Sequence, residues 1–393
     1  MVLNSLDIDL LRKHTPACRE LIHFNNAGAA LNPVQVTDAV IEHLLLEQKI
    51  GGYEAQEQAS VKAENFYQAF ARLLNCDARE IAYAESATRA WNLLFHALDF
   101  KAGDRILTGQ SEYASNYLAL LYMAKQRHVI IDVVDNNADG QICLEQLASK
   151  IDGDVKLIAL THVASQSGVI QPAEQVGEIA RRHNIFYLLD ACQSAGQIAL
   201  DVNRIGCDML TGTGRKYLRG PRGTGFMYVR HGILDQLQPQ FIDQHAARWV
   251  STDDYVFRDD ARRFEIWESF LAGKIGLGVA ADYAYALGMD NIQHRVQTLA
   301  ARLRDALAGL TDVSVHDQGN RLSGIVTFSK SGESAEMLHR RLYNRGINSS
   351  IARRSGALLD FERRNLDDIN RASVHYYNTE DEIARFCQAV AES

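Results

Sequence analysis

Two stretches of the sequence decide the fold, Ile185-Phe186-Tyr187-Leu188-Leu189-Asp190 and Thr211-Gly212-Thr213-Gly214-Arg215-Lys216. The first is an apolar run that ends in a carboxylate, which predicts a buried strand with Asp190 at its end. The second combines hydroxyl, glycine and basic residues, and it runs into the turn Leu218-Arg219-Gly220-Pro221-Arg222-Gly223. An acid at the end of a buried strand, followed by a loop of this kind with a lysine, is typical of a site for pyridoxal phosphate (PLP).

The residues around this lysine are predicted to contact different parts of the cofactor. Lys216 is expected to bond covalently to PLP, and Asp190 to pair with the pyridinium nitrogen so that the ring can accept electrons. Gln193 lies one helical turn after Asp190, where it can donate a hydrogen bond to the ring oxygen. Thr213 and Arg215 are expected to reach the phosphate from the side of the lysine. A lone lysine in a glycine-rich loop is more often solvated. The prediction therefore rests on the whole group of residues around Lys216.

Two further segments are candidates for cofactor contacts. Ser86-Ala87-Thr88 follows an apolar run and opens a helix, where hydroxyl and backbone N–H groups can converge on a phosphate. A plain helix cap is the alternative for these residues, and the presence of Lys216 favours the phosphate. Glu112-Tyr113 follows another apolar run, and Tyr113 is expected to lie flat on the cofactor ring, with an ordinary core tyrosine as the alternative.

Short apolar runs alternate with helical stretches through the first two thirds of the chain. The predicted strands are Ile81–Ala84, Arg105–Thr108, Val129–Val134, Leu157–Thr161, Ile185–Leu189, Asp208–Leu210 and Gly225–Val229. Helices are predicted between them at Ala90–Leu98, Asn116–Lys125 and Ala173–Arg182. This alternation predicts an α/β fold with a mostly parallel seven-stranded sheet flanked by helices.

Helix signals precede and follow this region. Asn32-Pro33 predicts a helix start with Asn at the cap and Pro in the first turn, Gly51-Gly52 ends that helix, and another is expected over Glu57–Leu74. The long helical stretches Gly278–Ala286 and Asp290–Leu310 are expected to lead into a second domain. That domain is predicted to hold strands Gly324–Phe328 and Ala372–Tyr376 with helices Ser334–Arg345 and Glu380–Ala391.

The length of 393 residues favours more than one domain, because single cores rarely grow so large. We expect an N-terminal segment over residues 1–30 that contributes to the substrate site. A large PLP-binding domain is expected over residues 31–285, and a smaller α+β C-terminal domain over residues 286–393.

Composition excludes several classes of function. The net charge is −8 and no basic run is present, so nucleic acid is not an expected partner. No apolar stretch reaches the length of a membrane span, and no signal pattern opens the chain. The six cysteines are scattered and the thirteen histidines lack metal-ligand spacing, which predicts a reducing cytoplasm and no metal.

On these motifs the chain resembles the fold-type I, class V PLP enzymes, the aminotransferase and cysteine desulfurase-like family. The resemblance covers nearly the whole length. The matching segments are Asn25-Asn26-Ala27-Gly28, Ser86-Ala87-Thr88, Glu112-Tyr113, His162-Val163-Ala164-Ser165, Asp190-Ala191-Cys192-Gln193, Thr213-Gly214-Arg215-Lys216 and Asn370-Arg371-Ala372-Ser373.

The resemblance implies additional site residues. Arg371 would grip the α-carboxylate of an amino-acid substrate, in a homodimer with active sites near the subunit boundary. Asn26, Ala27 and Gly28 would form the substrate loop, and Ser165 would lie beside the ring. Ser269 would be the residue that a partner subunit supplies to the phosphate.

The chain also departs from the family pattern. Cysteine desulfurases carry a catalytic cysteine on the loop before the arginine, but Ile347–Asp360 contains none, and Cys387 comes too late to serve. Tyr113 and Ser165 stand where His and Asn are usual. The segment after Phe264-Glu265 offers only Ser269 in place of the usual threonine.

The phrases Ile50-Gly51-Gly52-Tyr53-Glu54 and Val163-Ala164-Ser165-Gln166-Ser167-Gly168-Val169 resemble carbon–sulfur lyases, including the hercynylcysteine sulfoxide lyases of ergothioneine synthesis. The expected activity is therefore β-elimination from a cysteine-derived amino acid, with Lys216 as general base and release of pyruvate and ammonia. Transamination and epimerisation by the same residues remain alternatives. A non-catalytic PLP-binding protein is the alternative outside enzymes.

Overall fold

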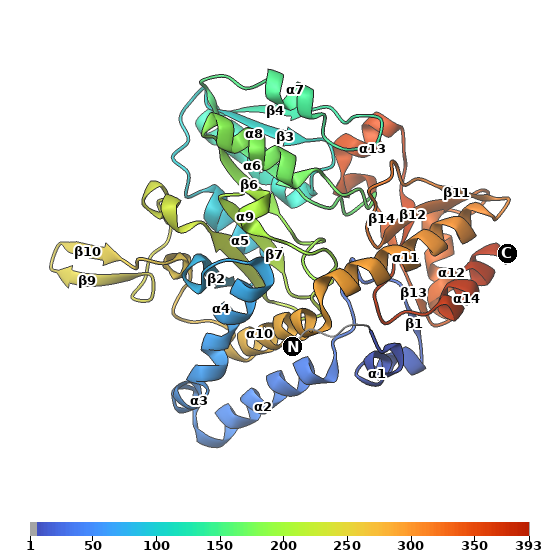
Figure 1. Ribbon diagram of the computed structural model, residues 1–393, viewed down its shortest axis with the longest axis horizontal. Coiled ribbons are helices and arrows are strands. Elements are labelled where there is room, and N and C mark those ends of the chain that lie inside the picture. Colours follow the sequence, from blue (N-terminus) through green and yellow to red (C-terminus); the bar gives the residue numbers. More distant parts are fainter. Residues whose placement is uncertain (1–5, 393) are drawn as a thin grey trace.

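The computed structural model describes residues 6–392, and its largest element is a seven-stranded sheet (Figure 1). The strand order is β2-β8-β7-β6-β5-β3-β4. The strands are β2 (Ile81–Ala84), β3 (Arg105–Gly109), β4 (Ile130–Val134), β5 (Val155–Thr161), β6 (Phe186–Asp190), β7 (Met209–Thr213) and β8 (Gly225–Val229). Strand β8 runs antiparallel to both of its neighbours, and the other paired strands are parallel. The predicted mostly parallel seven-stranded sheet is confirmed.

Helices cover both faces of this sheet (Figure 1). They include α5 (Ala87–Phe95), α6 (Ala114–Arg127), α7 (Leu144–Ser149), α8 (Ala173–His183) and α9 (Val202–Ile205). Successive side chains of a strand point to opposite faces. Ile158 therefore packs in one core with Val176 of α8, whereas Leu157 packs in a second core with Leu120 of α6. Burial on both faces explains the continuous apolar runs in the sequence.

A further group of helices, from before and after the sheet in sequence, packs together. They are α2 (Val34–Ile50), α3 (Gly52–Gln58), α4 (Ser60–Leu74), α10 (Leu271–Leu287) and α11 (Met289–Ala308). Pro33 is the N-cap of α2 rather than part of its first turn, and no side chain caps that end. The predicted helix over residues 57–74 is interrupted at Ala59, and Gly288, with φ at +83°, separates α10 from α11.

A four-stranded antiparallel sheet forms the C-terminal part, in the order β11-β12-β15-β14. Its strands are β11 (Val313–Val315), β12 (Ile325–Lys330), β14 (Ser350–Ala352) and β15 (Ile369–Ser373). Its helices are α12 (Ala335–Asn344), α13 (Leu358–Arg364) and α14 (Glu380–Ala391). Strand β15 begins three positions before the expected Ala372, because the polar residues Asn370 and Arg371 are buried strand residues here. The proposed division into domains stays a prediction.

Several elements were not expected from the sequence. Near the N-terminus are the short helix α1 (Ile8–Lys13) and strand β1 (Ile22–His23), which pairs in parallel with β13 (Ile347–Asn348). Strands β9 (Ala247–Ser251) and β10 (Asp254–Phe257) form a hairpin that projects from the body at the left of Figure 1. Short 3₁₀ turns occur at Pro16–Arg19, Ala78–Glu80, His231–Gln236, Ala261–Phe264 and Arg354–Gly356. Within residues 6–392 no helix has the length and apolar character needed to cross a membrane.

Candidate active site

Lys216 lies just after β7, at the carboxyl end of the parallel strands, where α/β proteins bind ligands. Its side chain is 5% exposed and makes no hydrogen bond or ion pair with any described residue. Nζ lies 5.6 Å from the centre of the Tyr113 ring. Burial lowers the pKa of Lys216, and the positive charges of Arg215 and Arg371 add to that shift. A lysine in this environment is suited to act as a nucleophile and a base.

Asp190 is the last residue of β6, as the sequence predicted, and both of its oxygens accept hydrogen bonds. Oδ1 accepts from the backbone N–H of Cys192 at 2.7 Å, and Oδ2 accepts from Asn116 Nδ2 at 2.7 Å. These bonds fix the carboxylate at the strand end. The sequence did not identify Asn116, because an amide on the first turn of a helix has many possible roles.

Gln193 brings three of the predicted segments together. Its Nε2 donates to the Ala27 carbonyl at 3.0 Å and to the Ser165 hydroxyl at 3.1 Å. Both amide hydrogens are therefore used within the protein, and donation to the ring oxygen stays a prediction. Its Oε1 is buried without a hydrogen-bond partner among the described residues, which is costly unless a ligand supplies a donor.

Arg371 reaches the same place from β15 of the C-terminal sheet. One guanidinium nitrogen donates to the Ser165 carbonyl at 2.9 Å, while Nε is buried without a partner within residues 6–392. Burial lowers the pKa of Arg371 to about 10. A buried guanidinium with unused donors fits the carboxylate of an amino acid, which could accept two parallel hydrogen bonds from it.

The residues predicted for the phosphate gather at the neighbouring strand ends. Ser86 caps α5 by accepting from the Arg89 backbone N–H at 3.1 Å, so the helix presents its free N–H groups there. Thr213 pairs with Gly225 across β7 and β8. A Cβ at Gly225 would lie 2.7 Å from the Ser86 carbonyl carbon, so only glycine allows this close approach. Arg215 donates to the Gly28 carbonyl.

The N-terminal substrate loop is held by internal hydrogen bonds. Asn26 is fully buried, and its Nδ2 donates to the Ser373 carbonyl at 2.7 Å while its Oδ1 accepts from Tyr377. The Ala27 N–H donates to the Ser373 hydroxyl at 2.9 Å. The Asn26 side chain therefore shapes the loop, and its direct contact with substrate stays a prediction, as do those of Ala27 and Gly28.

Tyr113 is positioned by a buried acid that the sequence analysis did not assign to the site. Glu112 accepts from the Thr161 backbone N–H at 2.8 Å and from its hydroxyl at 2.7 Å, and the Tyr113 N–H donates to that hydroxyl at 3.3 Å. Burial raises the pKa of Glu112 to about 7, against the opposing effect of the Thr161 hydrogen bonds. Glu112 thus fixes the backbone from which the Tyr113 ring extends.

A second buried acid supports the strand that leads to Ser86. Glu265 accepts from the Tyr83 backbone N–H at 2.7 Å, and Lys274 Nζ lies 3.4 Å from its Oε2. Burial opposes ionisation of Glu265, but Lys274, hydrogen bonds from the protein and His245 together lower its pKa to about 2. Ser269 lines a small hollow with Glu85 and Arg89, so it lies beside the phosphate segment of its own chain. Its contact with a partner's phosphate stays a prediction.

These groups fit PLP. The structure brings Lys216, Asp190, Gln193 and Arg371 to one edge of the sheet, with an unpaired amine, an unpaired amide oxygen and unused guanidinium donors. Lys216 would hold the cofactor covalently, Asp190 its ring nitrogen, and the Ser86 segment with Thr213 its phosphate. The roles of the individual residues stay predictions.

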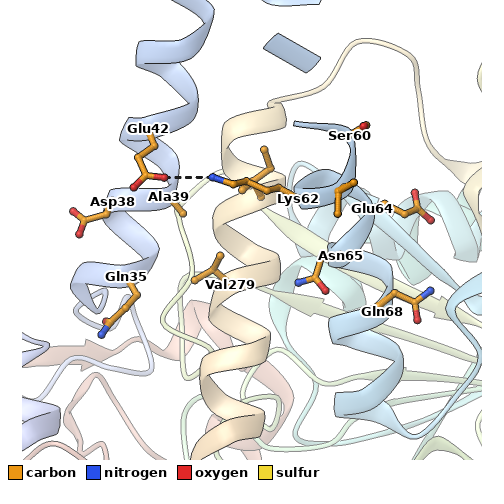
Figure 2. Close-up of a pocket in the computed structure, with 12 residues that line it drawn as sticks. Gln35, Asp38, Ala39, Glu42, Ser60, Lys62, Glu64, Asn65, Gln68 and Val279 are labelled. Atoms are coloured by element: carbon orange, nitrogen blue, oxygen red, sulfur yellow. Dashed lines mark hydrogen bonds and ion pairs between the residues drawn. The ribbon is translucent and has the colours of Figure 1, made fainter. Parts of the chain in front are cut away.

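A large hollow among the described residues lies away from the candidate site. It has a volume of about 1040 Å³ between α2, α4 and α10, and Figure 2 shows the ion pair of Lys62 with Glu42 across it, at 3.4 Å. None of the predicted site residues lines it. Its side chains are mostly exposed and belong to helix surfaces, so we do not place the chemistry there.

Comparison with known proteins shows which family the chain resembles in sequence and fold. A sequence profile described as Aminotransferase class-V matches residues 22–386. A probable cysteine desulfurase of Methanothermobacter thermautotrophicus is 27% identical over 391 residues, 97% of this chain and 97% of that protein. The apo structure of a cysteine desulfurase from Thermococcus onnurineus NA1 has a TM-score of 0.91 at 27% identity, covering 100% of this chain and 98% of that chain.

A solved lyase is also similar in fold. The complex of the cystine C–S lyase C-DES with its reaction product cysteine persulfide has a TM-score of 0.87 at 21% identity. It covers 96% of this chain and 99% of that chain. At this level of identity the likeness concerns the fold alone.

Proposed function

The chain belongs to the class V aminotransferase family, whose cofactor is pyridoxal phosphate, and from this premise we propose that it is a lyase for a C–S bond. The substrate is a cysteine-derived amino acid whose sulfur carries a further group R. In the balanced reaction, R–S–CH₂–CH(NH₃⁺)–COO⁻ and one water give R–SH, pyruvate and ammonium. No oxidant or reductant is needed.

The site supplies the groups that this reaction requires. Arg371 binds the α-carboxylate through its unused guanidinium donors, which orients the α C–H bond. Lys216 Nζ accepts the α-proton, as its lowered pKa allows, and the sulfur group leaves from the neighbouring carbon. Asp190 would pair with the ring nitrogen of bound PLP, and the cofactor would supply the electron sink.

The positions of the cysteines favour a C–S lyase over a persulfide-forming desulfurase. A persulfide-forming desulfurase needs a nucleophilic thiolate, and residues 347–360 before Arg371 contain no cysteine. Cys192 is the cysteine next to Asp190, and burial together with that carboxylate raises its pKa well above the usual range. Burial likewise raises the pKa of Cys18 and Cys387 to about 11 and that of Cys207 to about 12. These thiols are protonated at neutral pH.

The direct test is a panel of cysteine S-conjugates and their sulfoxides, assayed for pyruvate and for the released sulfur fragment. We expect the two products in equal amounts from at least one member, without added thiol. Release of alanine with a persulfide on the protein would identify a desulfurase instead. A keto acid that retains its sulfur would identify transamination, and racemised substrate an epimerase.

Cysteine variants sharpen this test. Replacing each cysteine by serine is expected to leave pyruvate release within about twofold, since none of them bonds to sulfur in the proposed reaction. Cys192→Ser is the critical variant, because Cys192 lies beside Asp190. A large loss of sulfur release in one cysteine variant that still folds would restore a persulfide mechanism.

We further propose that the enzyme is a homodimer in which the partner's Ser269 lies at the phosphate. Large apolar side chains at the surface support this proposal. Trp267 is 48% exposed and Phe270 42% exposed, on the two sides of Ser269. Exposed aromatic residues concentrated in one segment are typical of a subunit interface.

A further inference from the structure

Arg219 is a fully buried cation in the turn that follows the cofactor lysine. Its side chain fans out to three acceptors, with Nε donating to the Leu31 carbonyl at 2.7 Å. One terminal nitrogen donates to the Tyr376 hydroxyl at 2.7 Å and the other to the Thr15 hydroxyl at 2.5 Å. The guanidinium carbon lies 4.5 Å from the centre of the Tyr377 ring and 5.2 Å from that of Tyr376.

No carboxylate balances this charge. Within residues 6–392, Arg219 forms no ion pair with an Asp or Glu side chain, although it is only 1% exposed. Buried arginine is usually paired, since removing an isolated charge from water is costly. Here a carbonyl, hydroxyls and the faces of aromatic rings take the place of the carboxylate. Polar and π groups of this kind leave the cation permanently charged and fix its direction.

The backbone at Arg219 is also strained. Its φ is +59°, in the left-handed region that glycine adopts freely and other residues occupy at a cost of about 1 kcal/mol. A glycine would relieve that strain but would lose every contact of the side chain. The side-chain contacts therefore hold the backbone in this conformation, and the Arg219 N–H donates to the Lys216 carbonyl at 2.9 Å in the resulting turn.

The contacts of Arg219 join the three segments that form the candidate site. Thr15 and Leu31 flank the substrate loop, and Tyr376 follows the strand of Arg371. A second contact joins the same C-terminal segment to the turn of Lys216, because His375 Nε2 lies 3.0 Å from the Tyr217 carbonyl oxygen. One side chain thus connects the turn of Lys216 to residues far away in sequence at both ends of the chain.

We propose that Arg219 is a positioning residue, which locks the N-terminal loop and the Tyr376–Tyr377 segment onto the turn that presents Lys216. It touches neither substrate nor cofactor. Its side chain sets where Lys216 Nζ lies relative to Asp190 and Arg371, through the turn hydrogen bond to the Lys216 carbonyl. The inference rests on Lys216 as the cofactor lysine and not on the identity of the substrate.

The test compares Arg219→Lys with Arg222→Lys in the PLP-loaded protein. Arg222 lies in the same turn, is exposed, and forms no ion pair with a described residue, so it controls for the substitution itself. The readouts are PLP affinity and the pH midpoint of the visible absorption band that borohydride removes at Lys216. In Arg219→Lys we expect affinity about tenfold weaker, the scale of one lost hydrogen bond. The midpoint should rise by roughly one pH unit as water enters the turn.

A purely structural role would give a different result. Arg219→Lys would then lower Tm but keep the PLP affinity and the absorption midpoint of Arg222→Lys, and that outcome would overturn the proposal. If Arg219→Lys does not fold, Tyr376→Phe and Thr15→Val each remove one acceptor. Both are expected to move the midpoint in the same direction by a smaller amount, and two unchanged midpoints would reject a positioning role.

Discussion

The carboxyl edge of the seven-stranded sheet buries charged side chains, whereas the β9–β10 hairpin exposes apolar side chains. At the sheet edge, Asp190, Lys216 and Arg371 are buried, and their neighbours come from the same chain. The hairpin exposes its apolar side chains instead, with Trp249 at 78% and Tyr255 at 47% exposure. Figure 1 shows that it extends away from the rest of the molecule.

The two regions differ in whether their side chains are covered within one chain. A two-stranded hairpin is marginally stable on its own in water, and exposed aromatic residues make it a surface for association. At the sheet edge, hydrogen bonds within the chain hold Asp190 and Arg371. The position of Lys216 should therefore depend on contacts within its own chain, whereas the hairpin should depend on a second copy.

The largest effect is expected at the sheet edge, from Lys216→Ala. Turnover should fall by about 10²–10⁴-fold or more, because a positioned acid–base group is removed. PLP should still bind through the phosphate segment and Asp190, without the covalent link that borohydride traps. Pyruvate release measures turnover, and borohydride trapping measures the covalent link. Lys62→Ala, at an exposed lysine, is the control. Near-normal turnover would assign the proton transfer to another group.

Arg371→Lys tests the same edge from the substrate side. Lysine replaces a planar fork with one point charge, so KM should rise about 10–150-fold while PLP affinity changes little. KM and PLP affinity are measured side by side, with Arg385→Lys on the exposed face of α14 as control. A lower Tm with unchanged KM would make Arg371 a structural residue of β15.

The hairpin is tested by Trp249→Ser. A tryptophan that is a hot spot of an interface contributes about 2 kcal/mol, so the dimer should dissociate at about thirtyfold higher protein concentration. Light scattering over a dilution series measures this change. Met337→Ser on α12 is the control for loss of an exposed apolar side chain. A parent protein that is an active monomer at micromolar concentration would contradict the contrast between the two regions.

The last expected effect is a pH dependence of stability at Glu112. Its folded pKa of about 7 lies above the ordinary value of 4.5, so its stabilising contribution is complete below pH 4.5 and is lost as pH rises through 7. Glu112→Gln mimics the neutral acid and should not show that loss. Urea unfolding of the parent protein and of Glu112→Gln is measured from pH 4.5 to 8. The pH-dependent loss in the free energy of unfolding of the parent, relative to the variant, should grow to about 3 kcal/mol. Parallel pH profiles would show that Glu112 ionises normally.

Local sequence was sufficient for the strands of the large sheet. Ile185–Leu189 and its counterparts are apolar runs bounded by turn residues, and strands buried on both faces have no other composition available. Asp190 was predicted because it ends such a run, and Lys216 because the hydroxyl, glycine and basic residues of its loop lie next to it in the sequence. The hairpin was missed, since its apolar side chains are exposed and no buried face imposes a pattern on Ala247–Phe257.

The sequence by itself determined the sheet and the positions of Asp190 and Lys216 at the ends of its strands, since these depend on residues close together along the chain. Only the tertiary structure decided that Arg371 lies against Ser165, that Gln193 contacts Ala27, and that Arg219 lies among tyrosines of the C-terminal segment. Contacts between residues so far apart along the chain leave no periodic signal. They form only when packing of the two sheets brings the segments together, and that packing is a property of the whole chain.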